Sequence, residues 1–124
     1  MADADMMKLY SGRILALAAD MPRTARLASP SGSAKKRAPL CGSTVTVDLE
    51  IKDGIITEYG QDVKACALGQ AAASVVGRHI IGLSRHEVQQ GRDALSDMLK
   101  SGGPAPTAPF AELEVLMPAR QLAK

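Results

Sequence analysis

The chain has 124 residues, 46% of them hydrophobic and 23% charged, and its formal net charge is +2. This length and composition favour one globular domain with one modest core. With no Trp, one Phe and two Tyr, the chain lacks the aromatic side chains that stack on bases, and the small net charge does not indicate a polyanion, so we expect no nucleic-acid partner.

The N-terminal residues 1–10 are acidic and then amphipathic, unlike the basic start and apolar block of a secretory signal peptide. No apolar run approaches the ~18 residues of a membrane-spanning helix. We therefore expect a cytoplasmic protein without a membrane partner, in a compartment where thiols stay mostly reduced.

The segment from Met6 to Ala19 has the apolar spacing of an amphipathic helix, and Pro22 follows its end. Residues 21–39 combine Pro, Ser, Gly, Ala and basic residues without a period, which predicts a long loop. For the basic run Lys35-Lys36-Arg37 within it, two interpretations stay open: a solvated loop, or a docking site for an acidic partner.

A β-hairpin is predicted next. Its turn is Asp53-Gly54, and its second strand runs from Ile55 to about Lys64. In the first strand, apolar residues alternate strictly with polar ones and so predict one buried face, made of Val45, Val47, Leu49 and Ile51.

The register of this hairpin follows from keeping that face apolar. A two-residue turn would pair Leu49 with Glu58 and so mix the two faces. A three-residue loop, residues 52–54, would pair Val47 with Tyr59 and keep the face coherent. We therefore predict the three-residue loop.

Two helices are predicted after the hairpin. The Ala-rich residues 66–82 have a helical apolar stripe. Ser84 and Glu87 have the spacing of a capping box, which opens a second helix that ends near residue 101. Residues 101–110 indicate a linker, and residues 111–120 a short helical or irregular element.

The two cysteines of the chain, Cys41 and Cys66, come to the open end of the hairpin under either register. Cys66 lies where a strand passes into a helix, and amides at a helix N-terminus favour a thiolate. Cys41 precedes Gly42, which leaves its thiol accessible. Two converging thiols are half of a tetrahedral Zn or iron–sulfur site, and two small buried hydrophobic residues are the alternative.

Neither histidine is expected to complete such a site. His79 follows Cys66 by thirteen residues, which corresponds to roughly 20 Å along a helix axis. We expect His79 at the edge of the core and His86 in an exposed first helical turn.

The sequence from Ala38 to Gly82 resembles the NifU-like (IscU/SufU-type) iron–sulfur cluster assembly scaffold family. The stretch "APLCGSTVTVDLEI" is similar to the first cysteine loop of the family and the strand after it. The stretch "KACALGQAAAS" is similar to the second cysteine and its helix, and the late segment "PFAELEVLMPAR" is also similar.

This resemblance implies an α+β domain with a small antiparallel sheet and helices packed on one side. It implies a single scaffold domain over residues 1–124, truncated at its C-terminus, and a scaffold rather than an enzyme. Such a protein accepts sulfur from a cysteine desulfurase, holds a transient iron–sulfur cluster or Zn, and passes the cluster to acceptor proteins. Cys41 and Cys66 are the implied cofactor and metal ligands, and homo-oligomerisation stays open.

The sequence also departs from the family pattern. Ser43 stands where the family has an acidic ligand, and a hydroxyl is a poorer ligand for these metals. The third cysteine of the family would lie beyond Lys124. Three interpretations therefore stay open: a scaffold with a third ligand from outside this sequence, a non-assembling binding or regulatory homologue with an incomplete site, and a thiol-based sulfur-transfer protein.

Overall fold

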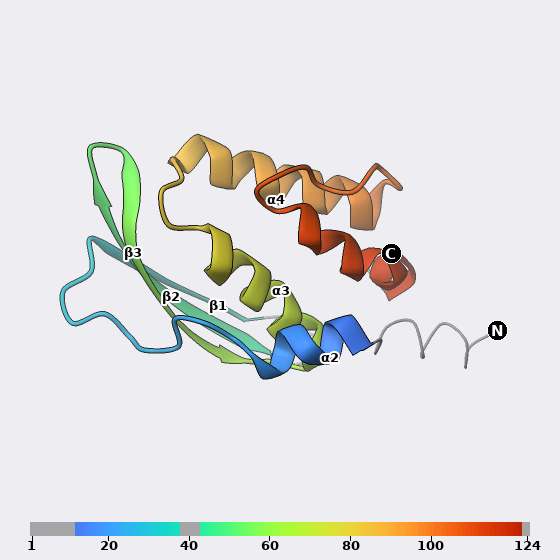
Figure 1. Ribbon diagram of the computed structural model, residues 1–124, viewed down its shortest axis with the longest axis horizontal. Helices are drawn as coiled ribbons and strands as arrows, with labels where there is room; N and C mark the ends of the chain where they lie inside the picture. Colours follow the sequence, from blue (N-terminus) through green and yellow to red (C-terminus); the bar gives the residue numbers. More distant parts are fainter. Residues whose placement is uncertain (1–11, 38–42, 123–124) are drawn as a thin grey trace.

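The structure is a computed structural model that describes residues 12–37 and 43–122. In chain order its elements are α2 (Gly12–Ala19), β1 (Gly32–Arg37), β2 (Thr44–Lys52), β3 (Ile55–Lys64), α3 (Ala67–His79), α4 (Arg85–Lys100) and the 3₁₀ helix η1 (Ala111–Leu122). The strands form an antiparallel sheet in the order β1-β2-β3, and α3, α4 and η1 lie on one side of it (Figure 1). This arrangement confirms the α+β fold that the family resemblance implies.

Two groups of buried apolar side chains hold these layers together. The smaller group, Ile56, Tyr59 and Ile80, joins the sheet to the end of α3. The larger group joins the helices to one another and consists of Ile14, Leu17, Ala71, Val75, Met98, Phe110, Leu113, Val115 and Leu116. Full burial of a large aliphatic side chain contributes about 1.5–3 kcal/mol, so these groups supply the main driving force for folding. Within the described residues, no helix has both the length and the apolar character needed to span a membrane.

β1 is a strand where the sequence predicted a loop. It pairs antiparallel with β2, with Gly32 opposite Leu49 and Arg37 opposite Thr44. All six of its residues are exposed, so they carry no apolar alternation by which a strand is recognised. The basic run Lys35-Lys36-Arg37 therefore lies on an edge strand of the sheet.

The predicted three-residue hairpin loop is wrong. Lys52 pairs with Ile55 across the two-residue turn Asp53-Gly54, whose φ angles are 53° and 77°. Positive φ at both positions matches the right-handed twist of the two strands that leave the turn.

A β-bulge at Thr57 changes the register of the hairpin, so that apolar residues of β2 and β3 share one face despite the two-residue turn. The register shifts by one residue between Glu50 and Ile51, and the Thr57 hydroxyl donates to the Glu50 carbonyl at 3.2 Å. Beyond the bulge Leu49 pairs with Tyr59, whereas the register of the turn would have placed it opposite Glu58. The extra residue thus places Val47 and Leu49 on the face that packs against Ile56, Tyr59 and Ile80. Ile51, which was expected on the same buried face, is 40% exposed beside the turn.

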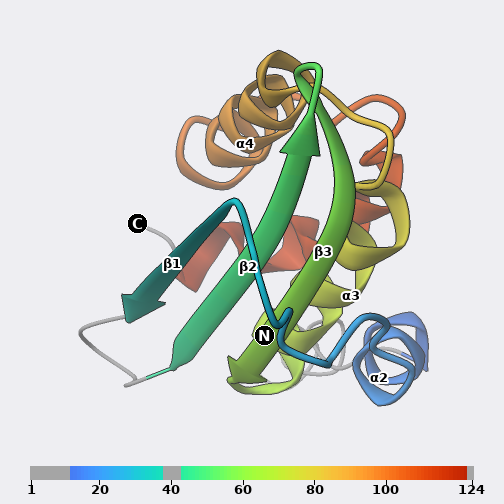
Figure 2. The same cartoon turned by 90° about the vertical axis from the view of Figure 1, so that its left-hand side faces the viewer.

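Residues 20–31, between α2 and β1, cross the other face of the sheet (Figure 2). We call this segment the strap. Asp48 on β2 is fully buried beneath it. The Asp48 carboxylate accepts hydrogen bonds from the Arg26 guanidinium at 3.0 Å, from the Leu27 amide at 3.1 Å and from the Ser33 hydroxyl. Hydrogen bonds from Arg26 and Ser33 hold the pKa of Asp48 well below its usual range.

The strap also requires a glycine beneath it. A Cβ placed on Gly60 would lie 2.2 Å from the carbonyl oxygen of Ala25. Nearer the start of the strap, the Arg23 guanidinium donates to the carbonyl of Gly77 in α3 at 2.9 Å. Residues 21–37 of the predicted loop therefore form a cover on the sheet followed by an edge strand, and residues 38 and 39 lie outside the described residues.

In the second half of the chain, the helices agree closely with those predicted from the sequence. The capping box that opens α4 is confirmed: the Ser84 hydroxyl accepts from the Glu87 amide, and the Glu87 carboxylate accepts from the Ser84 amide. The predicted linker 101–110 packs on α4, because Phe110 is buried and its ring lies against Gly91.

Candidate functional site

Two of the three predicted site residues, Ser43 and Cys66, lie in the described part of the chain. The β2–β3 ladder ends with Thr44 opposite Lys64. Ser43 immediately precedes this pair and is half-buried, and Cys66 follows it by two residues and is exposed. Cys41, and with it the expected proximity of the two thiols, lies outside the described residues.

Cys66 occupies the N-cap position of α3. Its backbone is extended, with φ −69° and ψ 174°, and its carbonyl accepts the first helical hydrogen bond from the Gln70 amide at 2.9 Å. Its side chain makes no capping hydrogen bond. The thiol is free and exposed, so its sulfur is available for chemistry instead of being used to stabilise the helix.

The backbone around Cys66 is fixed by packing on both sides. Ala67 and Leu68, which follow it, pack against the larger apolar group. Ala65, which precedes it, approaches the first turn of α3 so closely that a Cβ on Gly69 would lie 2.8 Å from the Ala65 Cβ. The thiol is therefore presented from a packed junction between β3 and α3.

A buried amide, Gln61, ties α3 to the sheet and to the strap. Its Nε2 donates to the carbonyls of Pro22 at 3.0 Å and Ala73 at 3.2 Å, and its Oε1 accepts from the Tyr59 hydroxyl at 3.4 Å. Gln61 is 1% exposed, so these bonds satisfy a polar group that would otherwise be costly to bury. They also fix the position of the helix that carries Cys66.

A second set of polar contacts ties α3 to the end of α2. The Ser74 hydroxyl donates to the carbonyl of Asp20 at 3.3 Å. Arg78 donates to the same carbonyl at 3.0 Å and to the Asp20 carboxylate at 3.2 Å. Together with Gln61, these contacts join α3 to the sheet, to the strap and to the end of α2.

The histidines are placed as the sequence predicted. His79 is the last residue of α3, at the opposite end from Cys66, and its Nε2 lies 2.8 Å from a carboxylate oxygen of Glu112 in η1. This contact lowers the pKa of Glu112. His86 is exposed in the first turn of α4. Neither imidazole belongs to the end of the sheet where Cys66 lies.

The described residues supply only part of a metal site. Across residues 12–37 and 43–122, no three His, Cys, Asp or Glu side chains gather closely enough to hold a metal ion. Cys66 is a ligand that both iron and zinc accept, whereas the Ser43 hydroxyl is a weak one. A metal or cluster at this end would therefore take further ligands from elsewhere in the chain or from a partner.

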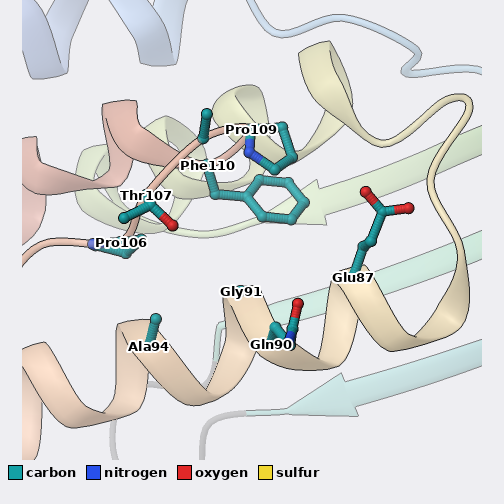
Figure 3. Close-up of a pocket in the computed structure, with 9 residues that line it drawn as sticks. Glu87, Gln90, Gly91, Ala94, Pro106, Thr107, Pro109 and Phe110 are labelled. Carbon is teal, nitrogen blue, oxygen red and sulfur yellow. The ribbon is translucent and has the colours of Figure 1, made fainter.

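A cavity of about 100 Å³ lies elsewhere, between α4 and the segment before η1 (Figure 3). The Phe110 ring and Pro109 form one side of it, and Gly91 and Gln90 of α4 the other. Its charged lining residue is Glu87, whose carboxylate already serves the cap of α4. The cavity is therefore a weaker candidate for a functional site than the surroundings of Cys66.

Comparison with solved structures identifies the fold. The chain is similar to the N-terminal part of a nitrogen-fixing NifU-like protein from Brucella abortus, with a TM-score of 0.93 and 44% identity over 95% of this chain and 82% of that chain. It is also similar to FiSufU, the SUF-system scaffold candidate for iron–sulfur cluster assembly from thermophilic Fervidobacterium islandicum AW-1, with a TM-score of 0.82 and 17% identity over 94% and 88% of the two chains.

A hypothetical protein shares the fold with a TM-score of 0.69 and 20% identity, over 94% of this chain and 81% of that one. No protein-family model and no curated protein matches the chain. The likeness to the Brucella protein is close in sequence as well as in structure and extends over almost the whole chain. The chain therefore belongs to the NifU-like family.

Proposed function

We propose that this protein is an iron–sulfur cluster assembly scaffold that accepts sulfur from a cysteine desulfurase and holds a cluster, or Zn, through Cys66 and Cys41 as cargo. The observation that carries the proposal is the position of Cys66, an exposed free thiol at the start of α3 in a NifU-like chain. The scaffold acts by binding and passing on its cargo, not as an enzyme.

Sulfur acceptance needs only an accessible thiolate. A persulfide on the desulfurase carries a terminal sulfur bonded to its cysteine sulfur. The Cys66 thiolate attacks the terminal sulfur, a new S–S bond forms on Cys66, and the desulfurase cysteine leaves as a thiolate. No external oxidant or reductant is consumed, because one S–S bond replaces another.

Cargo binding would use the same thiolate as a ligand. Thiolates suit both iron–sulfur clusters and Zn, and Cys41 is the second ligand that the proposal assigns. With Ser43 in place of a carboxylate, the two thiols fill two positions of a tetrahedral site, and the others would fall to water, to a partner or to ligands elsewhere in the chain. We therefore propose weak, transient binding, which suits a protein that gives its cargo away.

A non-assembling binding homologue is the second candidate function. It is favoured by Ser43, which contributes a hydroxyl at the end of the sheet where an acidic ligand is expected. Such a protein would keep the fold and its partners but would not retain iron.

Anaerobic reconstitution with ferrous iron, cysteine and a cysteine desulfurase distinguishes the two candidates. The scaffold proposal predicts a visible absorption spectrum of an iron–sulfur cluster, and, without iron, a mass gain of one sulfur atom on the protein. Cys66→Ser should lose both signals, whereas His86→Ala, a matched control at an exposed residue, should keep them. Sulfur uptake without any cluster spectrum would favour the second candidate, and equal uptake by Cys66→Ser would exclude Cys66 as the acceptor.

A further inference from the structure

The outer edge of β1 offers a place for another strand. Within the described residues the sheet ends at β1, and all six residues of this strand are exposed. A strand at the edge of a sheet presents unpaired backbone amides and carbonyls to solvent. These groups can pair with an extended segment of another chain.

Three consecutive cations line this edge. Lys35 lies opposite Thr46 and Arg37 opposite Thr44, on the same face of the sheet as Ser33. Lys36 projects to the other face, since successive residues of a strand alternate. A segment added beside β1 would therefore meet a positive charge at three successive positions, on both of its faces.

These charges have no acidic partner among the described residues. The ion pairs of that part of the chain involve other cations, such as Arg26, Lys52 and Arg78. Arg37 also lies in one row with Thr44 and Lys64, so the cationic edge ends at the same end of the sheet as Cys66. The positive charge of β1 therefore extends to this end of the sheet.

We propose that β1 binds an extended acidic segment of a partner protein as a fourth strand of the sheet. Opposite charges on neighbouring strands attract, so acidic residues beside Lys35, Lys36 and Arg37 would fix the register. A second copy of this chain is disfavoured, because two such edges would place cations against cations. A nucleic acid is disfavoured because the chain has few aromatic residues for base stacking. Binding at β1 does not require Cys66 to carry sulfur or metal.

Binding of a synthetic peptide to the full chain tests the proposal. The probe is a fluorescein-labelled peptide of roughly eight residues, with three consecutive glutamates at its centre and Val and Thr on either side. We expect saturable binding by fluorescence anisotropy, with hydrogen-exchange protection confined to β1. The triple variant K35E/K36E/R37E should bind about tenfold more weakly or worse, whereas Lys100→Glu, at an exposed end of α4, should bind as the wild type does.

Two further probes on the unmodified protein separate strand pairing from simple charge attraction. The same peptide with alternate backbone amides methylated keeps its charges but loses ladder donors, and we expect it to bind at least about tenfold more weakly. A single-stranded oligonucleotide of similar charge should not compete. Equal binding of the methylated peptide, protection away from β1, or effective competition by the oligonucleotide would each overturn the proposal.

Discussion

The Arg26 guanidinium, about half exposed, forms an ion pair with the fully buried carboxylate of Asp48. The pair joins the strap to the central strand of the sheet, and the Leu27 amide and Ser33 hydroxyl complete the contacts of the carboxylate. A buried carboxylate held by such donors is stabilised in its charged form. Loss of either the charge or its donors should therefore loosen the strap.

Acid should weaken this attachment in a defined direction. The folded-state pKa of Asp48 lies below its ordinary value of about 3.9, so its contribution to stability is complete at neutral pH and is lost as the pH falls below about 4. Asp48→Asn should lower the free energy of unfolding at pH 7, and the two proteins should converge toward acid pH. Urea unfolding at several pH values measures this. Asp93→Asn, in the exposed pair with Arg92, is the control and should leave the curve unchanged. A constant difference at every pH would contradict the assignment.

Gly60→Ala should destabilise the protein by about 1–3 kcal/mol. The added Cβ would lie 2.2 Å from the Ala25 carbonyl oxygen, so the backbone of the strap must move. Gly32→Ala is a matched control in another strand, where a Cβ meets nothing within 4 Å, and we expect a change within about 0.5 kcal/mol. Chemical denaturation measures the free energy of unfolding of both variants. Similar losses of stability would show that the strap does not pack closely against β3 at Gly60.

Folding should not require the thiols. Cys66 is exposed, and the larger apolar group contains residues such as Ile14, Val75 and Met98 that bury their side chains without it. Replacing Cys66 and Cys41 with Ser should change the free energy of unfolding by no more than about 1 kcal/mol. Far-UV circular dichroism and a thermal melt measure this. A double variant that is unfolded at room temperature would mean that the site is structural.

Ser43→Asp should raise the affinity for Zn roughly tenfold, or about 1.4 kcal/mol. A carboxylate at the end of β2 would add a charged oxygen ligand beside the proposed thiolates. Calorimetric titration at fixed pH, in a chain lengthened to supply a further cysteine, is the measurement. Thr107→Asp, at an exposed residue of the segment before η1, controls for the added negative charge. Equal affinities of the two variants would mean that position 43 does not face the site.

Local signals in the sequence predicted the helices and the position of Cys66 well. The cap of α4 depends on Ser84 and Glu87, which are three residues apart, so its pattern is readable without the fold. The junction at Cys66 follows from the change of period between a strand and a helix, and the structure has that junction at the same residues. The family resemblance was carried by this region and is confirmed by the solved relative.

The rest of the sheet depends on distant contacts that the local pattern does not contain. The strap is ordered by Asp48, which lies 22 residues after Arg26 and looks like any polar residue on the outer face of a strand. β1 has only exposed residues, so nothing in its sequence alternates. The bulge at Thr57 has no local signature either, because the extra residue is defined by the pairing of β3 with β2. The completeness of the cysteine site depends on Cys41, outside the described residues.

The strap has one more consequence, for the order of events during synthesis. Its partners all come later in the chain: Asp48 follows Arg26 by 22 residues, and Gly77 follows Arg23 by 54. At about 5–20 residues per second, a ribosome would need roughly 3–11 s to add the residues between Arg23 and Gly77. The hairpin can pair as soon as β3 emerges, but its cover cannot be tied to α3 until that helix has left the ribosome. Nascent chains therefore pass through a stage in which Asp48 is already made but Arg23 has no carbonyl of α3 to bind.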